Sequence, residues 1–270
     1  YCTINFEIVV ISMAGAYRKG KSLLLNFFLD YLYKMQYTQQ ELELEEWITD
    51  DDIVEGFLYK SGQKRCTAGI WIWGFLYKSG QKRCTAGIWI WAEPILIDTP
   101  NGERYAVLLM DTQMDTQGCF EQPSGGNACA ALLALSTMLS SVQCYTMAEG
   151  IPDEALAVLS SFVDYGKLAS AEAKEFGKPY QRLAFLIRDF KLTDEMIYGV
   201  EGGNRLLVRT IQKSVANSAP LAEVRRHIRQ CFKDGISCYL LPHPGPKVAE
   251  PNSGFRGQVK GGGKTEGGGG

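Results

Sequence analysis

Short apolar runs typical of buried strands alternate along the chain with longer segments whose apolar residues recur at helical spacing. Residues 8–11 predict a buried strand, and residues 21–34 predict a helix that follows it after a glycine-containing loop. Further along, the pattern predicts a hairpin of residues 95–97 and 106–110, helices near 128–142 and 221–232, and strands at 183–187 and 238–241. Strands that alternate with helices predict an α/β fold with a mainly parallel sheet covered by helices on both faces.

Charge and composition exclude several classes of protein. Lysine and arginine total 28 against 30 aspartate and glutamate, and the net charge of -2 leaves no cationic surface for nucleic acid or an anionic membrane. The longest apolar stretch, residues 128–139, is shorter than the roughly 20 residues needed to cross a bilayer. Eight cysteines without a C-x-x-C pair and only two histidines predict neither a disulfide scaffold nor a histidine-rich metal centre. We therefore expect reduced thiols, no nucleic-acid partner and no membrane-spanning segment.

The two ends of the chain differ in composition from its middle. The chain starts at Tyr1, without an initiator methionine and close to the first predicted strand, which indicates truncation at the front. Residues 261–270 are mostly glycine around a Lys-Thr-Glu triplet, a composition that favours a flexible tail. We therefore expect one domain, residues 1–260, followed by this tail.

The chain contains an unusual perfect repeat. Residues 56–73 (GFLYKSGQKRCTAGIWIW) recur unchanged as residues 74–91, and residues 110–113 (MDTQ) recur as residues 114–117. Repeat folds need three or more units with capped ends, so two unaltered copies fit no such fold. The pattern favours a recent duplication, or an error in the sequence, over two separate functional units.

Residues 15–22 (GAYRKGKS) match the phosphate-binding pattern G-x-x-x-x-G-K-[ST], and they lie between a buried strand and a helix, as that motif requires. Gly15 and Gly20 let the backbone curl so that its N–H groups face phosphate oxygens. Lys21 brings a positive charge to the β and γ phosphates, and Ser22 is a ligand for Mg²⁺. The motif predicts nucleotide binding without a basic overall charge.

A loop of this kind works with an aspartate at the end of a central strand, which reaches Mg²⁺ through water, and with a following glycine that contacts the γ phosphate. The apolar strand predicted at residues 106–110 is followed by Asp111 and, after the short repeat, by Asp115. Asp111 lies closer to the strand end, but only the second copy keeps a glycine, Gly118. We favour Asp115, and Asp111 is the alternative.

With these motifs placed, the chain resembles the GTPase domain of the atlastin family, membrane-fusing members of the dynamin superfamily, from about residue 8 to residue 260. The resemblance rests on the phosphate loop and on further motifs in the expected order: TAGI at 85–88, VLLM at 107–110 followed by DTQG, ALSTMLSS at 134–141, RDF at 188–190, YG at 198–199 and LLPHPG at 240–245. It implies a P-loop GTPase with GTP and GDP as ligands and Mg²⁺ as cofactor.

The resemblance implies that guanine is read by an arginine–aspartate pair, Arg188 and Asp189, which follows the strand predicted at residues 183–187. A carboxylate accepts hydrogen bonds from N1–H and N2–H₂ of guanine, whereas adenine offers no such pair of donors. The loop at residues 242–248 resembles a guanine cap in which Val248 covers the base. The implied nucleotide-binding residues are Arg18, Lys19, Gly20, Lys21, Ser22, Leu23, Gln117, Gly118, Arg188, Asp189 and Val248.

The resemblance also assigns chemistry. The implied catalytic residues are Arg18, Lys21 and Thr85, and the implied metal ligands are Ser22, Thr85 and Asp115. Arg18 resembles an arginine finger inside the phosphate loop, which stabilises charge on the γ phosphate once dimerisation orders it. The switch threonine precedes a glycine by two residues, which fits Thr85 and, in the first copy, Thr67. We prefer Thr85 because its copy leads directly into the strand at residues 95–97, as in the family.

The resemblance further implies a homodimer formed through the GTPase domain, within a longer parent in the endoplasmic reticulum membrane whose GTPase domain faces the cytosol. Membrane contact and fusion would need parts of that parent beyond residue 260, and the fragment itself is expected to be soluble. Two alternatives stay open: a nucleotide-binding dimerisation module with little turnover, because inserted residues spoil the switch, and a GTPase of guanylate-binding-protein type. Arg18, Lys19 and the motif at residues 241–245 favour the atlastin side.

Overall fold

The computed structural model describes residues 6–15, 20–38, 57, 70–79, 82–113, 123–153, 155–156, 159, 180–192, 194–212, 219–232 and 234–245. The strands within them are β1 (Glu7–Gly15), β2 (Ile70–Ser79), β3 (Lys82–Ile90), β4 (Ile95–Asp98), β5 (Arg104–Gln113), β6 (Val142–Ala148), β7 (Arg182–Arg188) and β8 (Ile236–Leu240). The helices are α1 (Lys21–Thr38), α3 (Pro123–Leu139), α5 (Gly199–Leu207), which continues into the π-helical turn η1 (Val208–Gln212), and α6 (Ala219–Cys231).

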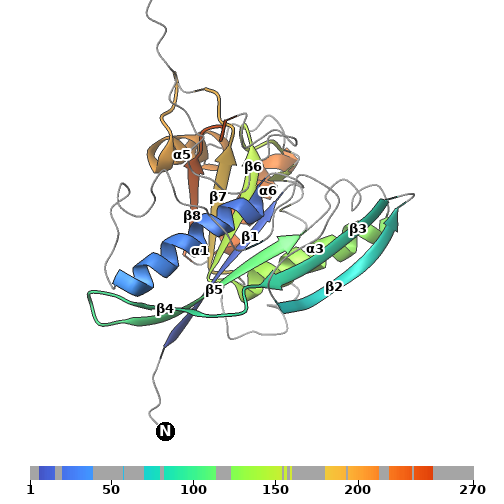
Figure 1. Ribbon diagram of the computed structural model, residues 1–270. Helices are drawn as coiled ribbons and strands as arrows, with labels where there is room; N and C mark the ends of the chain where they lie inside the picture. Colours follow the sequence, from blue (N-terminus) through green and yellow to red (C-terminus); the bar gives the residue numbers. More distant parts are fainter. Residues whose placement is uncertain are drawn as a thin grey trace, which may run out of the picture.

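All eight strands belong to one sheet, in the order β2-β3-β5-β1-β6-β7-β8, with β4 paired to β5 beside this path (Figure 1). The strands β5, β1, β6, β7 and β8 run parallel to their neighbours in that series. The pairs β2–β3, β3–β5 and β4–β5 are antiparallel. The mainly parallel α/β fold predicted from the sequence is confirmed, and β2, β3 and β6 are strands that the pattern did not predict.

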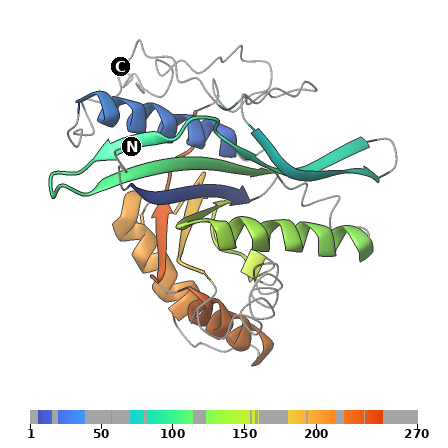
Figure 2. The ribbon, with the colours of Figure 1, turned by 90° about the horizontal axis from the view of Figure 1, so that it is seen from below.

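Helices cover both faces of the sheet, as expected (Figure 2). Helix α1 lies on one face, and α3, α5 and α6 lie on the other. In the part of the chain that the structure describes, no helix combines the length and the apolar character needed to cross a bilayer.

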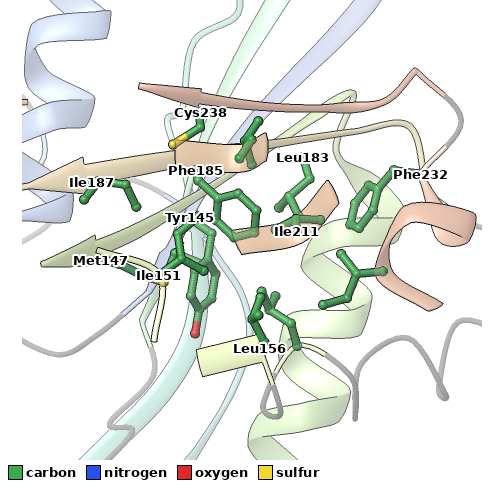
Figure 3. Packing of buried hydrophobic residues seen from close by; sticks show 14 of the residues in the cluster. Tyr145, Met147, Ile151, Leu156, Leu183, Phe185, Ile187, Ile211, Phe232 and Cys238 are labelled. Atoms are coloured by element: carbon green, nitrogen blue, oxygen red, sulfur yellow. The ribbon is translucent and has the colours of Figure 1, made fainter. Parts of the chain in front are cut away.

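Among the described residues, buried side chains form two hydrophobic clusters, one on each face of the sheet. Strand β7 contributes side chains to both clusters, because successive side chains of a strand point to opposite faces. Phe185 and Ile187 lie in the cluster between the sheet and helices α3, α5 and α6 (Figure 3). Ala184 and Leu186 lie in the cluster between the sheet and α1. A strand buried on both faces needs an almost continuous apolar run, and this is why residues 183–187 were recognisable in the sequence.

The buried stripe of α1 differs from the predicted one. The apolar residues that the sequence places at helical spacing are Leu24, Phe27, Phe28, Tyr31 and Leu32, and all five are partly buried. The most buried leucines are instead Leu25 and Leu29. Apolar residues occupy 11 of the 18 positions of this helix and lie on every side of it, so helical spacing alone did not distinguish the core face from its neighbours.

A buried hydroxyl cluster joins β1, β5, α3 and β6 behind the ends of the strands. Ser136 Oγ lies 2.7 Å from Ser12 Oγ, 2.6 Å from Thr112 Oγ1 and 3.1 Å from Gln143 Oε1. Because Gln143 Oε1 can only accept, the Ser136 hydroxyl donates to it and accepts from Ser12 and Thr112. The cluster therefore satisfies three fully buried hydroxyls at once and fixes α3 against the strand that carries Thr112.

Candidate functional site

The phosphate loop leaves the sheet at Gly15, the last residue of β1, whose φ is +134°. A Cβ at Gly15 would collide with the backbone carbonyl oxygen of Thr146 in β6, so only glycine lets the two strands end this close together. Thr146 is fully buried, and its Oγ1 donates a hydrogen bond of 2.8 Å to the carbonyl oxygen of Ala14. Strand β6 thus holds the point from which the loop departs.

Three polar groups meet where α1 begins. Lys21, the first residue of α1, is only 7% exposed. Ser22 Oγ donates a hydrogen bond of 2.8 Å to Asp111 Oδ2. Asp111 is fully buried in β5, where the parallel register places it beside Met13 of β1. An ammonium, a hydroxyl and a carboxylate therefore converge at the carboxyl ends of β1 and β5.

The electrostatics of this point favour an anion. Burial lowers the pKa of Lys21, and the negative charge of Asp111 opposes that shift. Additional negative charge at the same place would favour the charged ammonium further. The first turn of α1 also directs the positive end of its backbone dipole there. A phosphate group can therefore be held locally in a chain whose net charge is -2.

The carboxylate beside Ser22 is Asp111, the alternative to Asp115 in the sequence analysis. The pattern places the end of the apolar strand at residue 110, but β5 continues to Gln113, so Asp111 lies inside the strand. Asp115 lies outside the described residues, and its role stays a prediction.

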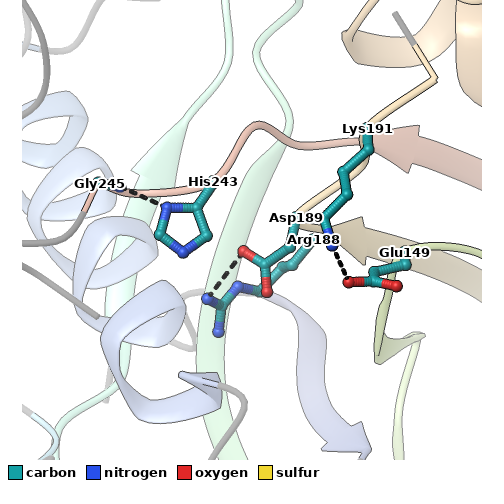
Figure 4. Close-up of polar contacts among 6 residues, drawn as sticks. All are labelled: Glu149, Arg188, Asp189, Lys191, His243 and Gly245. Carbon is teal, nitrogen blue, oxygen red and sulfur yellow. Dashed lines mark hydrogen bonds and ion pairs between the residues drawn. The ribbon is translucent and has the colours of Figure 1, made fainter. Parts of the chain in front are cut away.

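The predicted arginine–aspartate pair lies at the end of β7. Arg188 is the last residue of that strand, and Asp189 follows with a left-handed φ of +58°. Arg188 Nη2 lies 3.5 Å from Asp189 Oδ1, and the two side chains are 15% and 19% exposed (Figure 4). Aspartate adopts the left-handed conformation more readily than most residues. The pair thus occupies the sheet edge at which open α/β proteins bind their ligands.

Arg188 also reaches the phosphate loop. Gly20 has a φ of +70°, and a Cβ built on it would lie 2.5 Å from Arg188 Nη1. The guanidinium therefore packs directly against the loop backbone. This contact brings the arginine–aspartate pair and the start of α1 to one edge of the sheet.

The loops after β6 and β8 flank the pair (Figure 4). The backbone N–H of Glu149 donates to the carbonyl oxygen of Arg188 over 2.8 Å. The Glu149 carboxylate accepts a hydrogen bond from Lys191 Nζ, which raises the pKa of Lys191. After β8, His243 Nδ1 accepts a hydrogen bond of 3.0 Å from the N–H of Gly245. Hydrogen bonds therefore hold the loops after β6 and β8, on the two sides of Asp189.

The structure unites part of the predicted site. It brings Gly20, Lys21 and Ser22 together with Asp111 and Arg188, and Leu23 lies in the first turn of α1. The predicted residues that lie outside the described ones are Arg18, Lys19, Thr67, Asp115, Gln117, Gly118 and Val248.

Thr85 has a described backbone position in β3, opposite Leu76 of β2. Strand β3 pairs with β5 only from Gly87 to Ile90, so Thr85 lies beyond the part of β3 that is joined to the main sheet. Its role as switch threonine stays a prediction.

Two supporting residues were missed in the sequence. Asn26 is fully buried in α1, and its Nδ2 donates a hydrogen bond of 2.8 Å to the carbonyl oxygen of Phe57. A lone amide inside an apolar helix was the available signal, because buried polar groups need partners. Thr146 was missed because strand β6 itself was not predicted.

The donor set also fits a magnesium ion. The Ser22 hydroxyl and the Asp111 carboxylate are oxygen ligands, the type that Mg²⁺ prefers, and Lys21 lies beside them to share a bound phosphate. The arrangement can therefore hold a phosphate group with its magnesium ion at the start of α1, while a polar ring of the same ligand reaches Asp189.

The chain is similar in sequence to known proteins over almost its whole length. The profile of the family "Guanylate-binding protein, N-terminal domain" matches residues 2–74 and 74–255, and its two segments meet at the first residue of the second copy of the long repeat. Atlastin-2 of Homo sapiens is 41% identical over 257 residues, which are 95% of this chain and 38% of that protein. Atlastin of Drosophila melanogaster is 39% identical over 254 residues, 94% of this chain and 42% of that protein. The chain thus spans about two fifths of the length of these curated relatives.

The contact between Gly20 and Arg188 gives a testable prediction. Gly20→Ala and the control Gly102→Ala both force alanine into a left-handed conformation, and each should lower the free energy of unfolding by about 1–2 kcal/mol in urea titrations. A Cβ at Gly102 meets nothing within 4 Å, whereas one at Gly20 displaces the end of the Arg188 side chain. Only Gly20→Ala should therefore shift the side-chain N–H resonance of Arg188 in ¹⁵N NMR spectra. An unmoved resonance would show that the guanidinium does not pack on the loop.

Proposed function

The chain belongs to the family of guanylate-binding protein N-terminal domains, which are GTPases, and from this premise we propose that it binds GTP along the carboxyl edge of its sheet and hydrolyses it. The observation that carries the proposal is the packing of Arg188 against Gly20, because it puts a base-reading pair and a phosphate loop on one edge. Strands β1, β6 and β7 are consecutive in the sheet, so one nucleotide can extend from α1 to Asp189.

At the phosphate end, Lys21 would pair with the β and γ phosphates, and the N–H groups at the start of α1 would donate to their oxygens. The lowered pKa of Lys21 supports this role, because a bound phosphate supplies the negative charge that favours the ammonium. Gln117 and Gly118 are proposed to approach the γ phosphate from the segment after β5, and Lys19 and Leu23 to line the loop.

Ser22 and Asp111 are proposed to hold Mg²⁺, with Thr85 closing over it and Asp115 as the other candidate carboxylate. Their oxygen atoms match the ion's preference, and the 2.8 Å contact between Ser22 Oγ and Asp111 Oδ2 shows that the two side chains reach the same place. When bound, the ion offsets negative charge on the β and γ phosphates.

At the base end, Asp189 is proposed to accept hydrogen bonds from N1–H and N2–H₂ of guanine, and Val248 to cover the ring. Oδ1 of Asp189 is buried, and beside the ion pair with Arg188 at 3.5 Å no donor among the described residues makes a hydrogen bond to it. Adenine has no matching pair of donors and would leave the carboxylate buried beside an acceptor. The site should therefore select GTP over ATP.

Hydrolysis requires water to attack the γ phosphorus while the bond to the bridging oxygen breaks, which yields GDP and inorganic phosphate. We assign Arg18 to stabilise charge on the γ phosphate, delivered when two copies of the domain dimerise. The similarity to atlastins over almost the whole chain supports this assignment.

The same similarity supports a proposal for the longer protein. We assign it to the endoplasmic reticulum membrane, with this domain on the cytosolic side and with trans dimerisation driving fusion. Its membrane contact would come from segments outside this chain.

A second candidate is a module that binds GTP and dimerises with little turnover. The observation that favours it is the position of Thr85 in the β2–β3 ribbon, beyond the part of β3 that pairs with β5. Tight binding without measurable turnover would select this candidate.

Replacing Asp189 by asparagine should weaken GTP binding by about 2–3 kcal/mol, because the acceptor loses its charge and one of its two oxygens becomes an amide that cannot accept. Asparagine also tolerates the left-handed conformation, so the fold should survive. Fluorescent GTP and ATP analogues measure the change, and the exposed Asp194→Asn serves as the control. Equal affinity of the unchanged protein for both analogues would contradict the assignment of the base site.

Replacing Arg18 by alanine should slow single-turnover GTP hydrolysis by about 10³-fold while the affinity for nucleotide changes little. The rate of the unchanged protein should rise with protein concentration, and that of the variant should not. Arg182→Ala, at the other end of β7 from Arg188, is the matched control. Reduced affinity with unchanged turnover at saturating GTP would make Arg18 a phosphate anchor instead of a finger.

A further inference from the structure

The two copies of the long repeat do not play equal parts in the fold. Phe57, near the start of the first copy, is fully buried against α1, and its ring centroid lies 5.2 Å from that of Trp91, the last residue of the second copy. The Phe57 carbonyl oxygen accepts the hydrogen bond from Asn26. The first copy thus supplies the anchor at the head of this segment.

The second copy supplies the anchor at its tail. Ile88 is fully buried, and residues 87–90 pair with the end of β5. The Trp91 backbone N–H donates to the carbonyl oxygen of Leu109 over 2.9 Å, and its indole N–H donates to Tyr33 Oη over 3.0 Å. These contacts tie residues 87–91 to both β5 and α1.

Between the two anchors lies a ribbon that joins the copies to each other. Strand β2 contains the end of the first copy and the start of the second, and it pairs antiparallel with β3 from Ile70↔Ile90 to Ser79↔Lys82. Most of this ribbon extends beyond the pairing of β3 with β5. The ribbon therefore contains most of the described residues that lie between the two anchors.

Each anchor has an identical substitute 18 positions away in the sequence. Phe75 repeats Phe57, and residues 69–73 repeat residues 87–91, which form the tail anchor. A shift between identical sequences preserves which side chain faces which side of the sheet, so it carries none of the usual penalty of a register slip.

We infer that the chain exchanges between alternative arrangements of the repeat, called threadings here. Either Phe57 or Phe75 can pack against α1 as the head anchor, and either residues 69–73 or residues 87–91 can pair with β5 as the tail anchor. The structure shows the threading with the head of copy one and the tail of copy two. In a second, copy one supplies both anchors and residues 74–91 form a loop. In a third, copy two supplies both and residues 56–73 form the loop.

The threadings differ only in what the surplus residues do. Loop closure depends weakly on loop length, so an added loop at the surface is tolerated, whereas the anchors keep identical contacts. The antiparallel pairing of β2 with β3 favours the threading that the structure shows. The exchange also decides which threonine of the repeat, Thr67 or Thr85, precedes the strand that pairs with β5.

Deleting residues 74–91 tests the inference, since deleting residues 56–73 gives the same polypeptide. The shortened chain should unfold in one cooperative transition in urea, because it retains both anchors. Failure of this chain to fold would overturn the inference, whatever the full chain does with GTP.

Alanine variants of the two phenylalanines then test the exchange itself. In the full chain, Phe57→Ala should shift the urea midpoint less than the same substitution does in the shortened chain, because Phe75 takes over. The double variant Phe57→Ala with Phe75→Ala should shift the midpoint by more than the two single shifts together. Additive shifts, or a Phe57→Ala shift as large as in the shortened chain, would overturn the inference.

Discussion

The hydrogen bond of 2.8 Å from Ser22 Oγ to Asp111 Oδ2 is the contact on which the candidate site depends. It joins the first turn of α1 to β5, and the parallel register of β5 with β1 places Asp111 where the phosphate loop leaves the sheet. Behind it, the hydroxyl cluster around Ser136 fixes Thr112, the next residue of β5, against α3. The position of this carboxylate is therefore set from both faces of the sheet.

Burial explains how a chain without a basic surface can bind a polyanion. In a low-dielectric interior one ammonium exerts a larger effect than several solvated lysines, at the cost of a lowered pKa that a phosphate then counteracts. Arg188 is likewise mostly shielded from solvent, between Gly20 and Asp189. The candidate site thus relies on a few cationic side chains that burial and neighbouring residues hold in place.

The sequence predicted what local pattern and motif determine. The apolar run at residues 183–187 and the hairpin of β4 and β5 followed from periodicity. The phosphate-loop motif singled out Lys21 and Ser22, and the family resemblance singled out Arg188 and Asp189; their roles stay predictions. The core face of α1 could not be predicted, because its apolar residues lie on every side of the helix. Nor could local pattern tell where β5 ends, because pairing with β3 extends that strand to Gln113.

The role proposed for Ser22 and Asp111 is to hold Mg²⁺ beside the phosphates. The most direct test is calorimetric titration of GTP with and without Mg²⁺ into Asp111→Asn and Asp115→Asn. We expect Asp111→Asn to remove most of the gain in affinity that Mg²⁺ gives, and Asp115→Asn to retain it. A loss confined to Asp115→Asn would contradict the role of Asp111 and assign it to Asp115, in the second copy of the short repeat.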